Sequence, residues 1–310
     1  MERSSSKSSM TDAALAVAVD FGPDRTVIDR ALADVCERYL VAVPSPVSDA
    51  IRYSLMGPGK RLRGILFLRA FEAAGGTRDA SALAGAIEVV HAYSLVHDDL
   101  PCMDDDDVRR GRPTVHRVHG VAAATAAGLA MVPLAARCAA DAAMELGLPH
   151  GAVGAIVHDL MVASGAGGMI GGQLLDLEGE GRPLALDDLQ RIHRAKTGAL
   201  ITAAATLGGR AAGAPAERLD ALSRYGAAVG LAFQIADDVL DVTATTDQLG
   251  KTAGRDLELR KSTYPALLGV EGARARAAAL VDEGCSALDE VGLLTPALAR
   301  IAQFTVERTS

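Results

Sequence analysis

The 310-residue sequence has no tryptophan, and aromatic side chains make up only 3% of it. It also lacks any convincing run in which apolar and polar residues alternate, which is the pattern of a half-buried strand. Apolar residues recur instead at helical spacing over 82–96, 189–206 and 219–242. The sequence therefore predicts an all-α protein.

A basic surface is missing as well. The net charge is −8, whereas a nucleic-acid-binding protein needs an excess of Lys and Arg to displace counterions from phosphate. We therefore expect no nucleic-acid partner, and interpret local basic clusters as binding sites. The four cysteines are scattered without metal-ligand spacing, which is typical of a protein in a reducing cytoplasm.

Long uninterrupted apolar runs are also rare. The first ten residues are Ser-rich and lack the apolar segment of a secretory signal, so residues 1–20 are expected to be disordered or tag-like. Residues 121–144 are apolar, but Pro133, Arg137 and Asp141 interrupt them, and we predict a buried core helix rather than a membrane span. Gly- and Pro-rich turns elsewhere separate segments of helix length without a long linker, so residues 21–310 should form one helical domain.

Against this background, two acidic clusters are conspicuous. Asp98, Asp99 and Asp104 follow one apolar helical segment, and a second run, DDVLD at 237–241, ends another. Carboxylates at such places are costly unless they are neutralised, and their oxygens suit Mg²⁺, which is often held jointly by protein carboxylates and substrate phosphates. The pair of clusters predicts a site for a diphosphate bound through metal.

Helix geometry predicts how each cluster converges. Asp241 lies about 40° from Asp237 and about 60° from Asp238 around a helix, so these three carboxylates should share one face. Asp104 would point about 120° away from Asp98 on a straight helix. Pro101 should end or bend the helix and let Asp104 return towards Asp98.

Two basic groups flank the first cluster. Arg109 and Arg110 follow it directly, and Lys60 and Arg63 lie upstream in a Gly- and Pro-flanked turn. Guanidinium groups bind phosphate oxygens in a bidentate manner. Basic residues that simply balance neighbouring acids are the alternative for either group alone, but together they indicate a second, metal-free diphosphate.

At this point the chain resembles the trans-isoprenyl diphosphate synthases, the polyprenyl synthetase family. The matching stretches include GKRLR at 59–63, HDDLPCMDDDDVRRGRP at 97–113, HRAKTGAL at 193–200 and GLAFQIADDVLDV at 230–242. The resemblance covers roughly residues 25–305 and is strongest to bacterial short-chain farnesyl or geranylgeranyl diphosphate synthases. It implies a single polyprenyl synthetase domain over 21–310, an isoprenoid synthase helical bundle around a central cavity, and a homodimer.

The resemblance also implies roles for individual residues. Asp98, Asp99 and Asp104 would hold two Mg²⁺ ions and Asp237 a third, with Asp238 and Asp241 in support, so that about three ions serve each site. The allylic diphosphate would contact Arg109, Lys196, Lys251 and Lys261. Isopentenyl diphosphate would bind Lys60, Arg63, His91 and Arg110. Thr197 and Gln234 would line the reacting centre and stabilise positive charge on carbon.

The implied reaction condenses isopentenyl diphosphate with dimethylallyl or geranyl diphosphate by ionisation, condensation and elimination. An aromatic residue one turn before the first acidic cluster would limit the product to farnesyl diphosphate, and Tyr93 and Ser94 occupy that turn. Tyr93 as an ordinary core residue remains the alternative. Geranylgeranyl diphosphate is the alternative product, and a class I terpene cyclase or a non-catalytic synthase subunit are the alternative functions.

Overall fold

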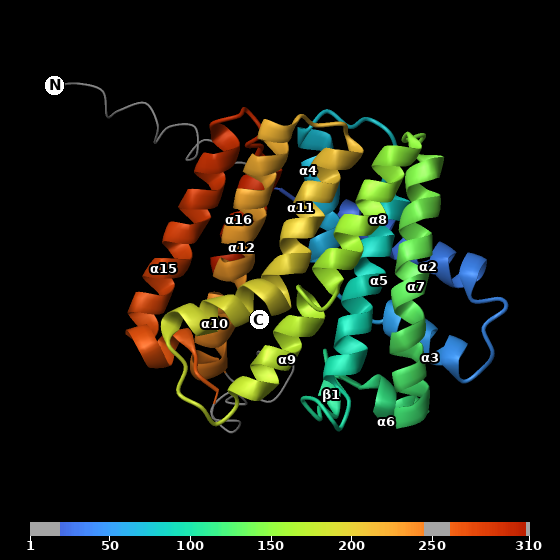
Figure 1. Cartoon of the computed structure of the whole chain (residues 1–310), viewed down its shortest axis with the longest axis horizontal. Helices are drawn as coiled ribbons and strands as arrows, with labels where there is room; N and C mark the ends of the chain where they lie inside the picture. The colour runs from blue at the N-terminus through green and yellow to red at the C-terminus, as the bar shows by residue number, and fades with distance from the viewer. Residues whose placement is uncertain (1–18, 245–260, 308–310) are drawn as a thin grey trace.

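A computed structural model describes residues 19–244 and 261–307 of the protein (Figure 1). The helices in the first half of the chain are α2 (Gly22–Tyr39), α3 (Val47–Leu55), α4 (Leu62–Ala73), α5 (Ser81–Asp98), α6 (Val115–His119) and α7 (Val121–Glu145). The second half contributes α8 (His150–Ser164), α9 (Met169–Gly179), α10 (Leu186–His193), α11 (Ala199–Ala211), α12 (Ala216–Thr243), α15 (Tyr264–Asp289) and α16 (Pro296–Glu307). The all-α prediction is confirmed.

The helices pack side by side as one bundle around α5, α11 and α12 (Figure 1). The helix α5 packs against α2, α4 and α7, while α11 lies between α4, α8 and α12. Leu83, Ile87 and Val90 of α5 are almost fully buried, and so are residues on its other faces. A helix that is apolar around its circumference is expected at the centre of a bundle.

Small residues bring some of these helices unusually close together. A Cβ atom on Gly230 of α12 would lie 2.9 Å from the Cα atom of Gly198, and one on Gly208 of α11 would lie 2.5 Å from the carbonyl oxygen of Phe67 in α4. Both distances are shorter than real Cβ contacts, so these positions require glycine. The Ala- and Gly-rich composition is therefore part of the packing.

The predicted helical segments 82–96 and 219–242 correspond to α5 and α12. The segment 189–206 contains an unexpected feature: α10 and α11 are joined by a π-helical turn, η1 (Arg194–Gly198). Single π turns within α-helices occur frequently at functional sites. The only strands in the described ranges are β1 (Val108–Arg109) and β2 (Arg112–Pro113), which form one antiparallel hairpin.

The expectation of a buried core helix over 121–144 is partly wrong. The helix α7 continues through Pro133, and one side packs on α5, but Leu129 is 63% exposed and Met144 is 49% exposed. The stretches Val121–Glu145 and His150–Gly179 are long and apolar enough to cross a membrane by length and composition alone. Helices at the core of a protein meet the same criterion, and α7 and α8 both pack against the bundle, so the prediction that no helix spans a membrane is kept.

Candidate active site

The first acidic cluster lies where α5 ends, at Asp98. After Pro101 the chain turns back, and the backbone N–H of Asp104 donates to the carbonyl oxygen of Asp98 at 2.9 Å. The predicted return of Asp104 to Asp98 is therefore confirmed. Burial raises the pKa of Asp98 to about 6, with Asp104 adding to the rise and Lys196 opposing it.

Asp99 is buried beside an arginine. Its side chain accepts a hydrogen bond of 2.6 Å from Nε of Arg109, whose guanidinium also lies 3.2 Å from Asp106. Burial nevertheless raises the pKa of Asp99 to about 6, because the desolvation of the carboxylate outweighs the attraction of Arg109. Arg109, which the resemblance assigns to the allylic diphosphate, is thus paired with the acidic cluster itself.

The β1–β2 hairpin aims the two arginines in different directions. Its two-residue loop, Arg110–Gly111, has φ angles of 54° and 72°, as a type I′ turn requires, and glycine adopts that backbone readily. Arg109 therefore faces Asp99, while Nη1 of Arg110 donates to the carbonyl oxygen of Pro58 at 2.8 Å.

Arg63, His91 and Arg110 form a basic group on the other side of the site. Nε2 of His91 lies 3.2 Å from Nη1 of Arg63 and 3.4 Å from Nη2 of Arg110. Burial, followed by the two guanidinium groups, holds the pKa of His91 well below its usual range, so His91 is neutral and its Nε2 accepts from both arginines. This arrangement presents two cations side by side, as recognition of a diphosphate requires.

The two acidic clusters and this basic group act on one another electrostatically. Burial lowers the pKa of Arg63 to about 10, and the charges of Glu88, Asp237 and Asp98 oppose that change. Asp98 and Asp237, from different clusters, are therefore both close enough to influence the same guanidinium. Lys60, from the same turn as Arg63, is exposed, with its Nζ atom 5.5 Å from the ring centre of Phe304 in α16.

Sequence reasoning missed the residue that shapes this turn. Arg61 is buried with a left-handed backbone, φ 51°. Its Nε donates to Asp29 at 2.7 Å, and its Nη2 donates to the carbonyl oxygens of Leu55 and Gly57 at 3.0 and 2.8 Å. Arg61 thus fixes the backbone between Lys60 and Arg63, and only its place inside GKRLR could have drawn attention to it.

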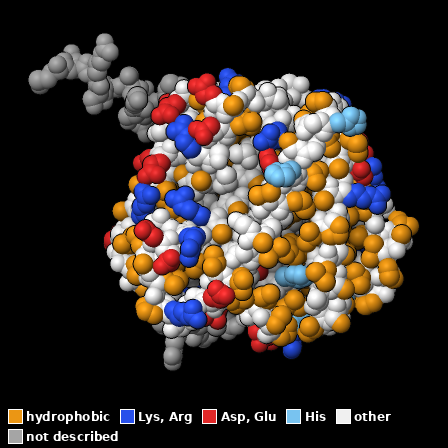
Figure 2. Space-filling view, in the orientation of Figure 1, with side chains coloured by type: hydrophobic (Ala, Val, Ile, Leu, Met, Phe, Trp, Pro, Cys, Tyr) orange, Lys and Arg blue, Asp and Glu red, His pale blue; other side chains and the backbone are white. Residues whose placement is uncertain are grey.

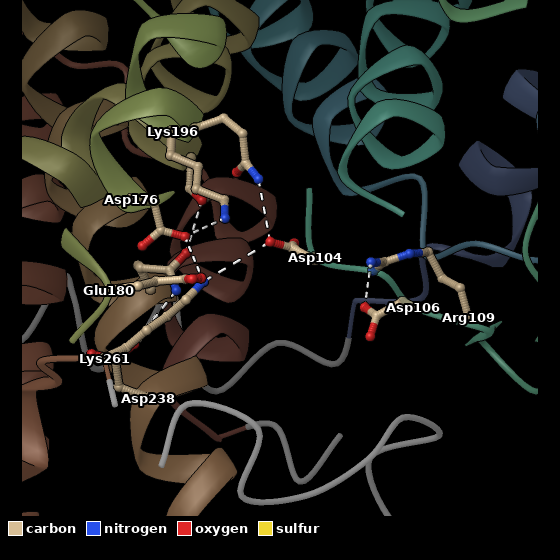
Figure 3. A network of polar contacts seen from close by, with 11 residues as sticks. Asp104, Asp106, Arg109, Asp176, Glu180, Lys196, Asp238 and Lys261 are labelled. Carbon is tan, nitrogen blue, oxygen red and sulfur yellow. Dashed lines mark hydrogen bonds and ion pairs between the residues drawn. The ribbon is translucent and has the colours of Figure 1, made fainter. Parts of the chain in front are cut away.

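A second ion network joins α9, η1 and the segment before α15 (Figure 3). Oδ2 of Asp176 accepts from Nζ of Lys196 at 2.7 Å and from Nζ of Lys261 at 2.9 Å. Lys261 also lies 3.4 Å from Glu180 and 4.0 Å from Asp104. Although burial lowers the pKa of Lys196, the carboxylates of Asp176, Asp104 and Asp98 outweigh it and raise that pKa, so both lysines remain charged.

Sequence analysis treats Asp176 only as a second-tier candidate, together with Gln173, and assigns no role to Glu180. Burial would raise the pKa of Asp176, but Lys196 and Lys261 together hold it well below its usual range. Asp176 lies on α9, whereas Glu180 follows the last residue of that helix with an extended backbone, so helical spacing does not relate the two. From the same helix, Nε2 of Gln173 donates to Asp104 at 3.3 Å, while its buried Oε1 has no hydrogen-bond partner among the described residues.

The π turn η1 connects the network to α12. Lys196 reaches Asp176, whereas the next residue, Thr197, donates from Oγ1 to Oε1 of Gln234 at 2.8 Å. On the α9 side, a Cβ atom on Gly172 would lie 2.1 Å from the backbone nitrogen of Lys196, so only glycine permits this approach. Thr197 and Gln234 were predicted together, and the structure brings them into contact.

The second acidic cluster differs from the prediction of one shared face. Asp237 is half-buried and Asp241 is buried. Asp238 is 2% exposed, and its Oδ2 accepts from the backbone N–H of Tyr264 at 3.0 Å and contacts Nε2 of His193 at 3.1 Å. Asp237 and Asp238 lie about 100° apart on a helix, which lets packing against α10 and α15 engage Asp238 inside the protein.

Tyr93 and Ser94 lie on α5, one turn before Asp98, and both are buried. The Tyr93 ring meets the His97 ring edge to face at 4.9 Å, and Ser94 donates to the carbonyl oxygen of His91 at 2.8 Å. His97 Nε2 contacts the carbonyl oxygen of Thr125 at 3.3 Å. Lys251, the remaining predicted contact of the allylic diphosphate, lies outside the described residues.

No group of three or more His, Cys, Asp or Glu side chains within the described ranges is arranged to hold a metal ion unaided. Asp98, Asp99 and Asp104 nevertheless supply the oxygen ligands that Mg²⁺ prefers, and two of these carboxylates have a raised pKa that a bound cation would lower. Phosphate oxygens of a substrate would complete such a coordination shell.

Comparison with known proteins agrees with this geometry. The family model "Polyprenyl synthetase" matches residues 44–290. The chain is 45% identical to a farnesyl diphosphate synthase from Escherichia coli over 279 residues, covering 87% of this chain and 93% of the relative. It is 40% identical to a geranylgeranyl diphosphate synthase from Cyanophora paradoxa, covering 86% of this chain and 89% of the relative.

Solved structures are similar as well. A geranyltransferase from Helicobacter pylori, in complex with magnesium and isoprenyl diphosphate, superposes with a TM-score of 0.79 at 30% identity, covering 94% of this chain and 97% of that one. An FPP/GFPP synthase from Zymomonas mobilis gives a TM-score of 0.76 at 33% identity, covering 91% and 98%.

Proposed function

Because this chain belongs to the polyprenyl synthetase family and is a short-chain trans-prenyltransferase, we propose that its product is (2E,6E)-farnesyl diphosphate. It would condense isopentenyl diphosphate with dimethylallyl diphosphate and then with geranyl diphosphate. The observation that carries the condensation of two diphosphates is the presence of two separate cationic groups at one acidic site, while the farnesyl product is supported by the 45% identity to a farnesyl diphosphate synthase. Lys196 and Lys261 meet at Asp176, while Arg63 and Arg110 meet at His91.

Magnesium belongs to this proposal because the family depends on it. We assign two ions to Asp98, Asp99 and Asp104 and a third to Asp237, with Asp241 in support. Asp238 is left out of the ligand set because its Oδ2 already contacts Tyr264 and His193. When bound, Mg²⁺ would neutralise the allylic diphosphate and make it a better leaving group.

One set of residues would act on the allylic substrate during the reaction. Lys196, Lys261 and Arg109 would stabilise the departing pyrophosphate as the allylic C–O bond breaks. Gln234 and Thr197 would direct oxygen atoms at the allylic carbocation. The isopentenyl double bond then forms the new C–C bond, and the released pyrophosphate takes the proton lost from the adjacent carbon.

The second diphosphate would be held by the basic group. Arg63 and Arg110 would bind the two phosphates of isopentenyl diphosphate, with Lys60 reaching in from the exposed turn. His91 would keep both guanidinium groups in place while remaining neutral. This division predicts that charge-neutral variants of Arg63 raise the KM for isopentenyl diphosphate alone.

Product analysis tests the proposal directly. Purified protein is incubated with Mg²⁺, isopentenyl diphosphate and an allylic diphosphate of five, ten or fifteen carbons, and the dephosphorylated products are separated by length. Farnesol as the main product supports the proposal. Geranylgeraniol would favour the second candidate, which relatives named geranylgeranyl diphosphate synthases also support. A cyclic hydrocarbon or no product would overturn it in favour of a cyclase or a non-catalytic subunit.

A homodimer is also part of the proposal. Apolar side chains are exposed along α7 and α8, including Leu129 at 63%, Val162 at 55% and Met144 at 49%, and Figure 2 shows hydrophobic side chains gathered over this side of the molecule. Exposed apolar patches of this kind are typical of subunit interfaces. Replacement of both Leu129 and Val162 by aspartate should convert a dimer to a monomer in light scattering, and a wild-type monomer would refute the proposal. A cytoplasmic location remains a prediction.

A further inference from the structure

Asp238 connects three separate parts of the bundle. It lies on α12, and its Oδ2 accepts from the backbone N–H of Tyr264, the first residue of α15. The same oxygen contacts Nε2 of His193, the last residue of α10. Its Oδ1 lies 3.5 Å from Nε2 of Gln234, at the outer limit of a hydrogen bond.

The chemistry of these contacts suits a fixed junction. Tyr264 N–H is one of the donors that a helix start leaves without an intrahelical partner, and Asp238 satisfies it. An ionised carboxylate only accepts hydrogen bonds, so Nε2 of His193 must carry the proton that it shares with Asp238. Asp238 and His193 are 2% and 7% exposed, which leaves little room for water to replace either contact.

Both partners of Asp238 lie three residues from a lysine of the site. Lys196 follows His193 within the π turn, and Lys261 precedes Tyr264. The two lysines converge on one oxygen of Asp176 at 2.7 and 2.9 Å. Ser262 ties the same segment to the α9–α10 connection, since its Oγ accepts from the N–H of Leu184 at 3.0 Å.

We propose that Asp238 is a positioning residue rather than a magnesium ligand. It sets the distance between η1 and the start of α15, so that Lys196 and Lys261 meet at one diphosphate. The inference rests on the proposed function for the identity of that diphosphate. The two adjacent aspartates of the second cluster then have different roles: Asp237 faces the metal, and Asp238 fixes the position of η1 relative to the start of α15.

A double-mutant cycle between Asp238 and His193 tests this. The variants are Asp238→Asn, His193→Leu and the double variant, each checked for cooperative melting, with His193→Gln as a rescue that keeps a donor near the Nε2 position. Steady-state kinetics give the KM for geranyl diphosphate, the KM for isopentenyl diphosphate and the Mg²⁺ concentration for half-maximal rate. Calorimetry with inorganic pyrophosphate and Mg²⁺ gives a binding readout that does not depend on turnover.

For a positioning pair, each single variant should reduce kcat/KM for geranyl diphosphate about tenfold and leave the KM for isopentenyl diphosphate within about twofold. The double variant should be no worse than the more severe single variant, because both remove the same junction. His193→Gln should recover most of the loss, and the Mg²⁺ requirement should stay near that of the wild type, in contrast to the matched variant Asp237→Asn.

The opposite pattern would overturn the inference. If Asp238 is a metal ligand, Asp238→Asn should raise the Mg²⁺ requirement as Asp237→Asn does, and His193→Leu should leave pyrophosphate affinity unchanged. Any reductions in kcat/KM caused by the two single variants would then multiply in the double variant. A wild-type protein without turnover counts against the proposed function instead. In that case the calorimetric cycle still decides whether Asp238 and His193 act together on pyrophosphate binding.

Discussion

Replacing Gly172 by alanine should impair the site without touching a charged group. The added Cβ atom would lie 2.1 Å from the backbone nitrogen of Lys196, 2.5 Å from its Cα atom and 2.7 Å from the carbonyl carbon of Ala195. All three are backbone atoms, so no side chain can rotate away. Restoring an ordinary contact requires α9 and η1 to separate by about 1 Å, and overpacking of this kind costs about 1–3 kcal/mol.

The functional effect should exceed the loss of stability. Separation of α9 from η1 pulls Asp176 away from Lys196, and displacements near 1 Å at a site can reduce the rate about 100-fold. We expect kcat/KM for geranyl diphosphate to fall by roughly one to two orders of magnitude, with a decrease in melting temperature of a few degrees. The KM for isopentenyl diphosphate should change little, because Arg63 and Arg110 lie on other elements.

Gly154 offers a matched control. It lies on the exposed side of α8, and a Cβ atom there would meet nothing within 4 Å. Alanine is favoured over glycine within helices by about 1 kcal/mol, so Gly154→Ala should melt slightly higher and keep full activity. If Gly172→Ala were as active as Gly154→Ala, the close approach of α9 and η1 would not support the site as argued.

Three further predictions concern the remaining parts of the site. Burial raises the pKa of Asp98 to about 6, so the folded metal-free protein binds this proton more tightly than the unfolded chain. The ionised carboxylate therefore destabilises the folded state above pH 6, and this destabilisation is lost as the pH falls towards 4. Asp98→Asn should therefore raise metal-free stability by up to about 3 kcal/mol at pH 7.5 and by about 1 kcal/mol at pH 4.5 in melting curves recorded with EDTA, whereas an equal gain at both values would contradict the shift. Tyr93→Ala should lengthen the product measured by chromatography, and an unchanged farnesyl product would remove Tyr93 from the chain-length argument. Arg61→Ala removes the contacts to Asp29 and to two carbonyl oxygens, and should destabilise the protein by about 3 kcal/mol and raise the KM for isopentenyl diphosphate about tenfold. Asp29→Asn, which keeps an acceptor, should have a milder effect on both, and an unaltered KM in Arg61→Ala would refute the role of the turn.

Local periodicity was sufficient to predict the helices and one of the two acidic clusters. The apolar spacing over 82–96 and 219–242 reports a property of each helix alone, and both helices form where it predicts. The return of Asp104 to Asp98 also followed from a local cause, since Pro101 cannot continue the helix. Such features can be predicted from the local sequence without knowing which elements pack against them.

Features that depend on neighbouring elements were not predictable in the same way. Asp238 has the right period for a metal-facing carboxylate, but the partners that bind it, His193 and Tyr264, lie 45 and 26 residues away along the chain. The convergence of Lys196 and Lys261 on Asp176 likewise depends on how α9 is placed. The π turn has no composition that distinguishes it from an α-helix, so the segment 189–206 read as one regular helix.

The π turn also makes the length of its segment a constraint in its own right. A π turn accommodates one residue more than the surrounding α-helical turns, so α10 and α11 both keep their buried faces on the core although the segment between them carries an extra residue. Loss of one residue between Arg194 and Gly198 would restore a regular helix and remove the widened turn from which Lys196 and Thr197 reach Asp176 and Gln234. The number of residues in this turn is therefore a requirement of the site, separate from the identity of its side chains.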